Sequence, residues 1–169
     1  MKELILGGVR SGKSALAELR AGDSGMQVIY LATATAGDDE MAARIKLHQQ
    51  QRPDNWLLIE EPVELAQTLK QYANINTCIL VDCLTLWLTN LLLEDEQLIP
   101  VKTGDLLDSL SSIPGRIIFV SNEVGGGIIP ADALSRRFCD EAGRLHQQLA
   151  ACCDRVTLVV AGLAQQLKP

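Results

Sequence analysis

The chain has 169 residues, 47% of them hydrophobic and 21% charged, which suits one compact domain with a buried core and excludes a second catalytic domain. Its 15 Lys and Arg residues stand against 21 Asp and Glu residues, and the formal net charge of −6 disfavours nucleic acid as the main partner. The longest apolar stretch, residues 78–93, is interrupted by Asp82, Thr85, Thr89 and Asn90, whereas a membrane-spanning helix needs about 20 nearly uninterrupted apolar residues. We therefore expect no membrane span.

The beginning of the sequence and its cysteines indicate a cytoplasmic protein. Met1, Lys2 and Glu3 precede a short apolar run that stops at Gly7 and Gly8, so the apolar core and cleavage site of a secretory signal are missing. The 5 cysteines form no CxxC pair, and an odd number fits neither a disulfide framework nor a zinc site. We expect reduced and mostly buried thiols.

Short apolar runs alternate with longer segments of helical periodicity, which is typical of βα units that form a mostly parallel sheet. The predicted strands cover residues 3–6, 27–32, 56–60, 78–81, 116–120 and 155–160. The predicted helices cover residues 13–21 with Gly22 as C-cap, 39–51, 62–72 with Pro62 in the first turn, 84–93, 105–111 and 131–151. We interpret residues 94–104 as a surface connection, because they include Pro100 and Gly104. The pattern predicts an α/β fold in a single domain, residues 1–169.

The strongest motif is GGVRSGKS at residues 7–14, a GxxxxGK(S/T) sequence between a predicted strand and a predicted helix. Glycines allow backbone N–H groups to close around phosphates at the positive end of the helix, while Lys13 reaches the β- and γ-phosphates and Ser14 binds Mg²⁺. The alternative is a glycine-rich turn with an exposed lysine. The motif predicts a phosphate-binding loop (P-loop) formed by Gly7, Gly8, Val9, Arg10, Ser11, Gly12, Lys13 and Ser14.

Asp82 is the second candidate for nucleotide chemistry. It ends the apolar strand at residues 78–81, and a carboxylate at the carboxyl edge of a parallel sheet can hold Mg²⁺ beside a bound phosphate. Many strands end in aspartate because it favours a turn or caps a helix, which is the alternative role. With the P-loop upstream, we expect Ser14 and Asp82 to hold the metal.

The two histidines have different contexts. Arg44, His48 and Arg52 recur at i, i+4 and i+8 of the predicted helix 39–51, so they share nearly one face that is able to meet an anion. A solvated or core-edge histidine explains the same spacing, and periodicity does not settle the choice. Imidazole is largely neutral at cytoplasmic pH and can attack phosphorus. His146 lies in a long amphipathic helix, and we interpret it as structural.

Two further segments, residues 120–127 and 84–93, each allow two interpretations. Residues 120–127 (VSNEVGGG) follow a predicted strand, where α/β proteins build their sites, so they form either a substrate loop or a long surface turn. The helix predicted at residues 84–93 carries more apolar surface than one face buries, so part of it is expected to pack against another subunit. The alternative is a helix central to the monomer.

Several motifs together resemble one known family. They are GGVRSGKS at residues 7–14, YLAT at 30–33, DEMAARI at 39–45 followed by His48 and Arg52-Pro53, VDCLT at 81–85 with TNLL at 89–92, and VSNEVG at 120–125. Over nearly its whole length the chain resembles the bifunctional adenosylcobinamide kinases / adenosylcobinamide-phosphate guanylyltransferases of cobalamin biosynthesis. It differs in having Val9 where the family usually has Ala, a third glycine at Gly127, and a short segment at residues 93–116.

The resemblance implies a P-loop NTPase fold with a RecA-like, mostly parallel sheet flanked by helices, and a homotrimer. It implies phosphorylation of adenosylcobinamide with ATP or GTP, assisted by Lys13 and Mg²⁺. GMP transfer from GTP to adenosylcobinamide phosphate then follows through guanylylated His48. By resemblance, the nucleotide contacts beyond the P-loop are Thr33, Ala34, Thr35, Gln49, Gln50, Gln51, Arg52, Glu60 and Asp82. The competing functions are a P-loop small-molecule kinase with one activity and a non-enzymatic nucleotide-gated switch.

Overall fold

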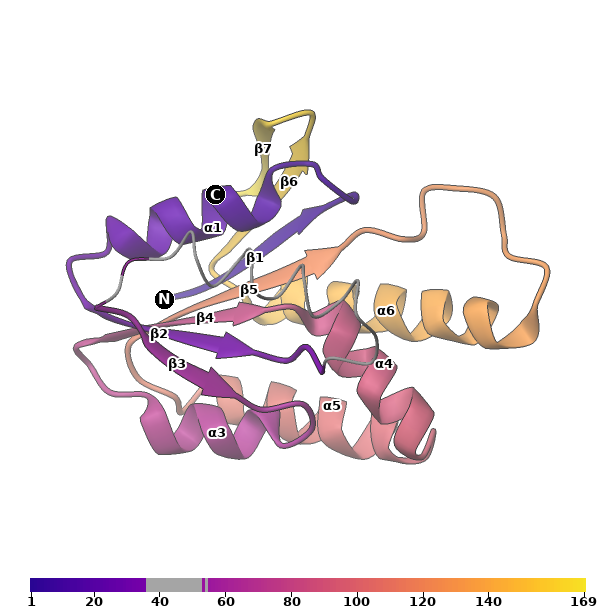
Figure 1. Ribbon diagram of the computed structural model, residues 1–169, viewed down its shortest axis with the longest axis horizontal. Helices are drawn as coiled ribbons and strands as arrows, with labels where there is room; N and C mark the ends of the chain where they lie inside the picture. Colours follow the sequence, from indigo (N-terminus) through magenta and orange to yellow (C-terminus); the bar gives the residue numbers. More distant parts are fainter. Residues whose placement is uncertain (36–52, 54) are drawn as a thin grey trace.

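One seven-stranded sheet forms the centre of the molecule (Figure 1). The computed structural model describes residues 1–35, 53 and 55–169. The strand order is β3-β2-β4-β5-β1-β6-β7, in which β7 alone pairs antiparallel among the described strands. The strands are β1 Lys2–Gly7, β2 Gln27–Ala32, β3 Leu57–Glu60, β4 Thr77–Asp82, β5 Arg116–Asn122, β6 Arg155–Val160 and β7 Leu163–Lys168. The predicted α/β class and mostly parallel sheet are confirmed.

Helices cover both faces of the sheet (Figure 1). In the described residues, α1 lies on one face, and α3, α4, α5 and α6 lie on the other. Their bounds are α1 Lys13–Gly22, α3 Leu65–Tyr72, α4 Leu84–Glu94, α5 Leu98–Leu110 and α6 Ala133–Cys152. None of these helices is both long and apolar enough to span a membrane. The helix predicted at residues 39–51 lies outside the described residues.

The two-residue period of the strands divides the core between the two faces. Leu4 packs with α3 to α6, whereas the next residue, Ile5, packs with α1. Ile29 and Tyr30 divide in the same way between the two faces of β2. Both faces are buried, which explains why the parallel strands appear in the sequence as nearly continuous apolar runs.

The sequence did not predict β7. A two-residue turn joins it to β6, and both turn residues, Ala161 and Gly162, have positive φ angles of 51° and 80°. This is the backbone of a tight hairpin turn, which the sequence usually marks with Asn-Gly or Asp-Gly rather than Ala-Gly. The strand is polar and largely exposed, so no apolar alternation marks it either.

The interpretation of residues 94–104 as a surface connection was wrong, because α5 begins at Leu98 and continues through Gly104. Pro100 is the third helical residue, where a backbone N–H has no partner inside the helix, so proline costs no hydrogen bond there. The helix predicted at residues 105–111 is the second half of α5. The proline in the first turn of α5 thus led to the prediction of a loop where the helix begins.

Two predicted helix ends were also misplaced. Gly22 is the last residue of α1, and the C-cap is Asp23 with an ordinary right-handed φ of −75°. Pro62 precedes α3, whose N-cap is Glu64. The carboxylate of Glu61 instead accepts the backbone N–H groups of Val63 and Glu64, at 2.8 and 2.7 Å, and so orders the turn before the helix.

The apolar helix α4 is central to the monomer. Leu84, Trp87, Leu88 and Leu91 are each at most 1% exposed, because α4 packs between the sheet and the neighbouring helices. Leu93 is the exception at 71% exposed. Leu86 and Leu92 are half-buried, so part of the helix keeps apolar surface, and its packing against another subunit stays a prediction. The expectation about thiols is confirmed, since Cys78, Cys83 and Cys153 are buried and no cysteine is paired.

Candidate functional site

The P-loop connects β1 to α1 at the carboxyl edge of the sheet. Gly12 is the N-cap of α1 with a φ of 97°, a conformation that glycine adopts without steric cost. Arg10 also has a positive φ, 56°, which costs a non-glycine residue about 1 kcal/mol. Together these two residues turn the chain sharply, so that the free N–H groups of the first turn of α1 lie at the loop. Such an arrangement suits an anion.

Close packing explains why the first and last glycines of the motif are required. A Cβ on Gly7 would overlap the Ser11 hydroxyl and lie 2.7 Å from the Val159 carbonyl oxygen of β6. A Cβ on Gly12 would lie 3.3 Å from the Cα of Gly162 in the β6–β7 turn. The amide of Gly162 also donates to the Ser11 carbonyl oxygen at 2.8 Å. The C-terminal hairpin therefore supports the P-loop from one side.

Lys13 extends back over the loop. Its ammonium donates to the carbonyl oxygen of Gly8 at 3.1 Å, so the positive charge lies against the loop, and no carboxylate of the described residues pairs with it. Ser14 follows it in the first turn of α1. Both residues thus stand at the start of α1, beside the loop, and their roles toward phosphate and Mg²⁺ stay predictions.

Asp82 ends β4, and β4 is two strands away from β1, with β5 between them. At the usual strand spacing this separation is about 10 Å. The hydroxyl of Tyr30 donates to Asp82 Oδ2 at 3.0 Å and fixes the carboxylate from the neighbouring strand β2. The oxygens of Ser14 and Asp82 are hard ligands of the kind Mg²⁺ prefers, and phosphate and water oxygens complete such sites. The donor set therefore fits Mg²⁺.

The residues after β2 are fixed by the start of α4. The Thr33 hydroxyl donates to the Cys83 carbonyl oxygen at 2.7 Å and accepts the Cys83 N–H at 2.9 Å. The amide nitrogen of Asn90 donates to the carbonyl oxygens of Thr33 and Pro62, at 2.8 and 3.1 Å. Asn90 thus ties the segment after β2 to the segment after β3. Burial and the nearby charge of Asp82 raise the pKa of the Cys83 thiol, so this cysteine stays protonated.

The end of β5 lies between the P-loop strand and the Asp82 strand. Asn122 donates from Nδ2 to the Thr85 hydroxyl at 3.0 Å, and the Glu123 N–H donates to the Gly7 carbonyl oxygen at 3.0 Å. His146 Nε2 lies 2.7 Å from the buried Ser121 hydroxyl, and burial lowers the pKa of His146 although Glu123 opposes the shift. This position supports the structural role expected for His146.

The carboxyl edge of the sheet collects most of the described candidates, but Glu60 stands apart. It ends β3, the outermost strand, four strands from β1, or about 19 Å at the usual spacing. Glu60 is exposed and thus accessible to a ligand. His48 and the candidate contacts Gln49, Gln50, Gln51 and Arg52 lie outside the described residues.

Three residues near the site were not chosen from the sequence as site residues, namely Tyr30, Asn90 and Asn122. Each acts through a partner that is distant in the chain, and periodicity does not detect such pairs. One signal was available, since Asn90 is a carboxamide inside a helix that is rich in leucine. A buried polar group needs hydrogen-bond partners, which indicates a structural link.

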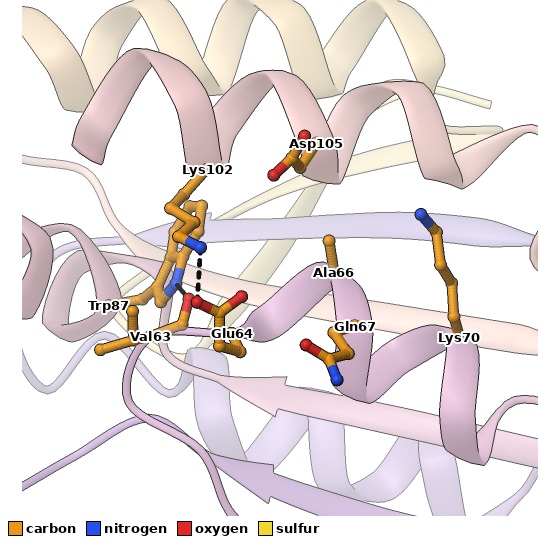
Figure 2. Close-up of a pocket in the computed structure, with 8 residues that line it drawn as sticks. All are labelled: Val63, Glu64, Ala66, Gln67, Lys70, Trp87, Lys102 and Asp105. Atoms are coloured by element: carbon orange, nitrogen blue, oxygen red, sulfur yellow. Dashed lines mark hydrogen bonds and ion pairs between the residues drawn. The ribbon is translucent and has the colours of Figure 1, made fainter. Parts of the chain in front are cut away.

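A pocket of about 280 Å³ lies elsewhere, between α3 and α5 (Figure 2). Lys102 of α5 and Glu64 form an ion pair at this pocket, and the Trp87 indole donates to the Val63 carbonyl oxygen at 2.9 Å beside it. Among the residues that the structure describes, no candidate for nucleotide binding lines this pocket. We therefore assign the candidate site to the carboxyl edge of the sheet and not to this pocket.

A glycine loop that joins β1 to α1, with one strand inserted between β1 and the strand of Asp82, defines a P-loop NTPase fold with a RecA-like sheet. Solved structures support this class. The RadB recombinase superposes with a TM-score of 0.55 at 15% identity, covering 93% of this chain and 73% of that one. At this identity the likeness establishes the fold alone.

Sequence comparisons define the family. The family model described as cobinamide kinase / cobinamide phosphate guanyltransferase matches residues 3–167. The bifunctional adenosylcobalamin biosynthesis protein CobP of Pseudomonas aeruginosa is 56% identical over 169 residues, which cover 99% of this chain and 98% of that protein. The corresponding protein CobU of Escherichia coli is 41% identical, covering 99% of this chain and 100% of that protein. The chain belongs to the cobinamide kinase / cobinamide phosphate guanyltransferase family, which confirms the resemblance and assigns it the two activities that the family's description names.

Proposed function

We propose that the single domain, residues 1–169, uses one P-loop for two successive reactions on a corrinoid. The first phosphorylates the aminopropanol hydroxyl of adenosylcobinamide with ATP or GTP. The second transfers GMP from GTP to the new phosphate and yields adenosylcobinamide-GDP. The observation that carries the proposal is the loop of residues 7–14, shaped for phosphates, in a chain of this family.

In the kinase reaction, the oxygen of the substrate hydroxyl forms a bond to the γ-phosphorus, the bond to the β-phosphate oxygen breaks, and the hydroxyl proton is lost. Lys13 neutralises charge on the transferred group, and the N–H groups of the P-loop hold the phosphates. Ser14 and Asp82 would hold Mg²⁺, which when bound would supply electrostatic stabilisation of the phosphate oxygens. Tyr30 keeps the Asp82 carboxylate oriented.

In the guanylyl transfer, neutral His48 attacks the α-phosphorus of GTP and pyrophosphate leaves, which gives a guanylyl-histidine. A phosphate oxygen of adenosylcobinamide phosphate then attacks the same phosphorus, and the imidazole leaves after it regains a proton. This role of His48 rests on the family resemblance and on imidazole chemistry. Lys13 stabilises the pyrophosphate, because it serves the same loop in both reactions.

The remaining expectations complete the proposal. Thr33, Ala34, Thr35, Gln49, Gln50, Gln51, Arg52, Glu60 and Asp82 contact the nucleotide beyond the P-loop. The protein works in the cytoplasm as a homotrimer, and nucleic acid is not its partner. The net charge of −6 supports the last point, because it repels a phosphate backbone.

The test uses GTP labelled at the α-phosphate, with products followed by mass spectrometry. Wild-type protein is expected to form an acid-labile, base-stable adduct on His48, and His48→Asn to form none while retaining at least part of its kinase activity. His146→Asn is the matched control, since it removes the other histidine of the chain and is expected to be labelled normally.

Three outcomes would contradict the proposal. Label on Lys13 or His146 would show that His48 is not the nucleophile. Phosphorylated corrinoid without any guanylyl adduct or GDP product would indicate a kinase with one activity. No corrinoid product, combined with nucleotide-dependent capture of a partner, would indicate a nucleotide-gated switch.

A further inference from the structure

Residues 124–131, which we call the arm, connect β5 to α6 and project beyond the carboxyl edge of the sheet (Figure 1). Ile128 and Ile129 lie on the arm and are 97% and 79% exposed. Ile128 is the most exposed of the large apolar side chains in the described part of the chain. Two adjacent branched apolar side chains in water are unfavourable unless they meet a partner.

Hydrogen bonds fix the arm at both ends. At its start, the Glu123 carboxylate accepts the backbone N–H groups of Gly125 and Gly126 at 2.8 and 3.1 Å. At its end, the Arg136 guanidinium donates to the carbonyl oxygens of Pro130 and Ala131, and Asp132 caps α6. The two isoleucines are therefore presented between two anchored ends, which lowers the conformational entropy that a ligand would have to remove.

The start of the arm is attached directly to the P-loop. The Glu123 N–H donates to the carbonyl oxygen of Gly7, the first residue of the loop, at 3.0 Å. Val9, within the loop, is itself 78% exposed. Exposed apolar side chains thus lie on both the phosphate-binding loop and the segment joined to it, so a molecule whose reactive group reaches the loop has an apolar surface beside it.

The charged groups at the two ends of the arm bind backbone groups, and its apolar side chains are what the arm exposes. Glu123 and Asp132 bind backbone N–H groups, and the Arg136 guanidinium lies against the carbonyl oxygens of Pro130 and Ala131. Adenosylcobinamide is a large cation whose corrin ring has apolar faces and methyl groups, and its reacting hydroxyl is on a flexible side chain. The apolar faces of the corrin ring therefore match the exposed isoleucines of the arm.

We propose that Ile128 and Ile129 form the docking surface for the corrin ring of cobinamide. The inference rests on the proposed kinase function and assigns the substrate side of the same site. The ring packs on the arm while its aminopropanol side chain extends to the P-loop, so the arm contributes to corrinoid affinity and not to triphosphate binding.

The experiment compares the double variant Ile128→Ser/Ile129→Ser with the control Ile75→Ser. Ile75 is 75% exposed but lies between α3 and β4, at the amino edge of the sheet. The double variant is expected to raise KM and the dissociation constant for cobinamide by about tenfold or more, with KM for the triphosphate within about twofold. The control is expected to match wild type, and the conservative Ile128→Leu/Ile129→Leu to retain most of the affinity.

Equilibrium dialysis, read from the visible absorbance of the corrinoid, measures its affinity separately from catalysis. Wild-type protein that does not phosphorylate cobinamide would refute the proposed function, whatever the variants do. Active wild type with an unchanged cobinamide affinity in the double variant would overturn the inference. A change of native mass in light scattering with unchanged corrinoid affinity would assign the arm to a second copy of the chain and overturn it too.

Discussion

The two ends of strand β1 use polar residues in opposite ways. At the amino end, Glu3 is fully buried and forms ion pairs with Arg20 of α1 and Arg116 of β5. Arg20 also donates to the Thr157 hydroxyl of β6 at 2.9 Å. At the carboxyl end, Gly7 opens the P-loop, and Lys13 has only the Gly8 carbonyl oxygen as a hydrogen-bond acceptor in the described residues.

The polar residues at the amino end of β1 contribute to stability, whereas those at its carboxyl end serve function. The charge of Glu3 is neutralised within the protein, so removing it leaves two partly buried guanidinium groups without their counter-charge. The charge of Lys13 faces a loop built for anions, so removing it costs a ligand contact and little packing. Variants at the two ends of one strand are therefore expected to affect different measurements.

The largest effect is expected from Lys13→Ala. Loss of the ammonium leaves charge on the transferred phosphoryl group unneutralised, so kinase activity should fall by about 1,000-fold or more. The midpoint of urea unfolding, followed by circular dichroism, should stay close to that of wild type. Activity near the wild-type rate would remove Lys13 from the proposed mechanism.

The next effect in size is expected from Glu3→Gln, which keeps the shape of the side chain but leaves Arg20 and Arg116 unpaired. The free energy of unfolding should fall by about 3 kcal/mol, while the rate per folded molecule stays the same. The matched control is Glu64→Gln, because Glu64 pairs with Lys102 at the surface and its side chain is 45% exposed (Figure 2). It should cost less than about 1 kcal/mol. Equal losses in the two variants would contradict the distinction drawn here.

The smallest effect concerns pH and His146, which lies between the core and the site edge. Burial lowers its pKa in the folded protein, so the unfolded chain takes up the proton first as pH falls through about 6.5. Stability contributed by the neutral imidazole is thus complete above that pH and declines below it. His146→Gln should flatten this decline in urea unfolding at pH 5 and pH 7.5. If the variant lost as much stability between pH 7.5 and pH 5 as wild type does, groups other than His146 would cause the acid sensitivity.

The sequence predicted the parts of the fold that depend on local pattern. Each of the six parallel strands was expected within one or two residues, because burial on both faces produces apolar runs. The P-loop was found because its chemistry lies in eight consecutive residues. Glu3 was placed in a strand without a partner, although a charged residue in an apolar strand indicates a buried ion pair. The partners Arg20 and Arg116 lie in other elements, and only the packed structure identifies them.

Local pattern misled where an exception to a general rule applied. Pro100 was treated as a breaker, but in the first turn of α5 it is compatible with a helix. The neighbours of α4 cover most of this apolar helix, and its sequence does not reveal how much of it they cover. In both cases the missing information was the tertiary environment.

The support of the P-loop by the β6–β7 turn bears on how the protein is made. The loop at residues 7–14 is among the first parts of this sequence to be synthesised, whereas its contact through Gly162 becomes available only when nearly all of the sequence has emerged. Strand β1 likewise pairs with β5 and β6, which are synthesised much later than β1. Such distant pairings form late and slowly. A nucleotide present during synthesis therefore has little to bind on the growing chain, and it can stabilise the protein only once the loop has met the β6–β7 turn.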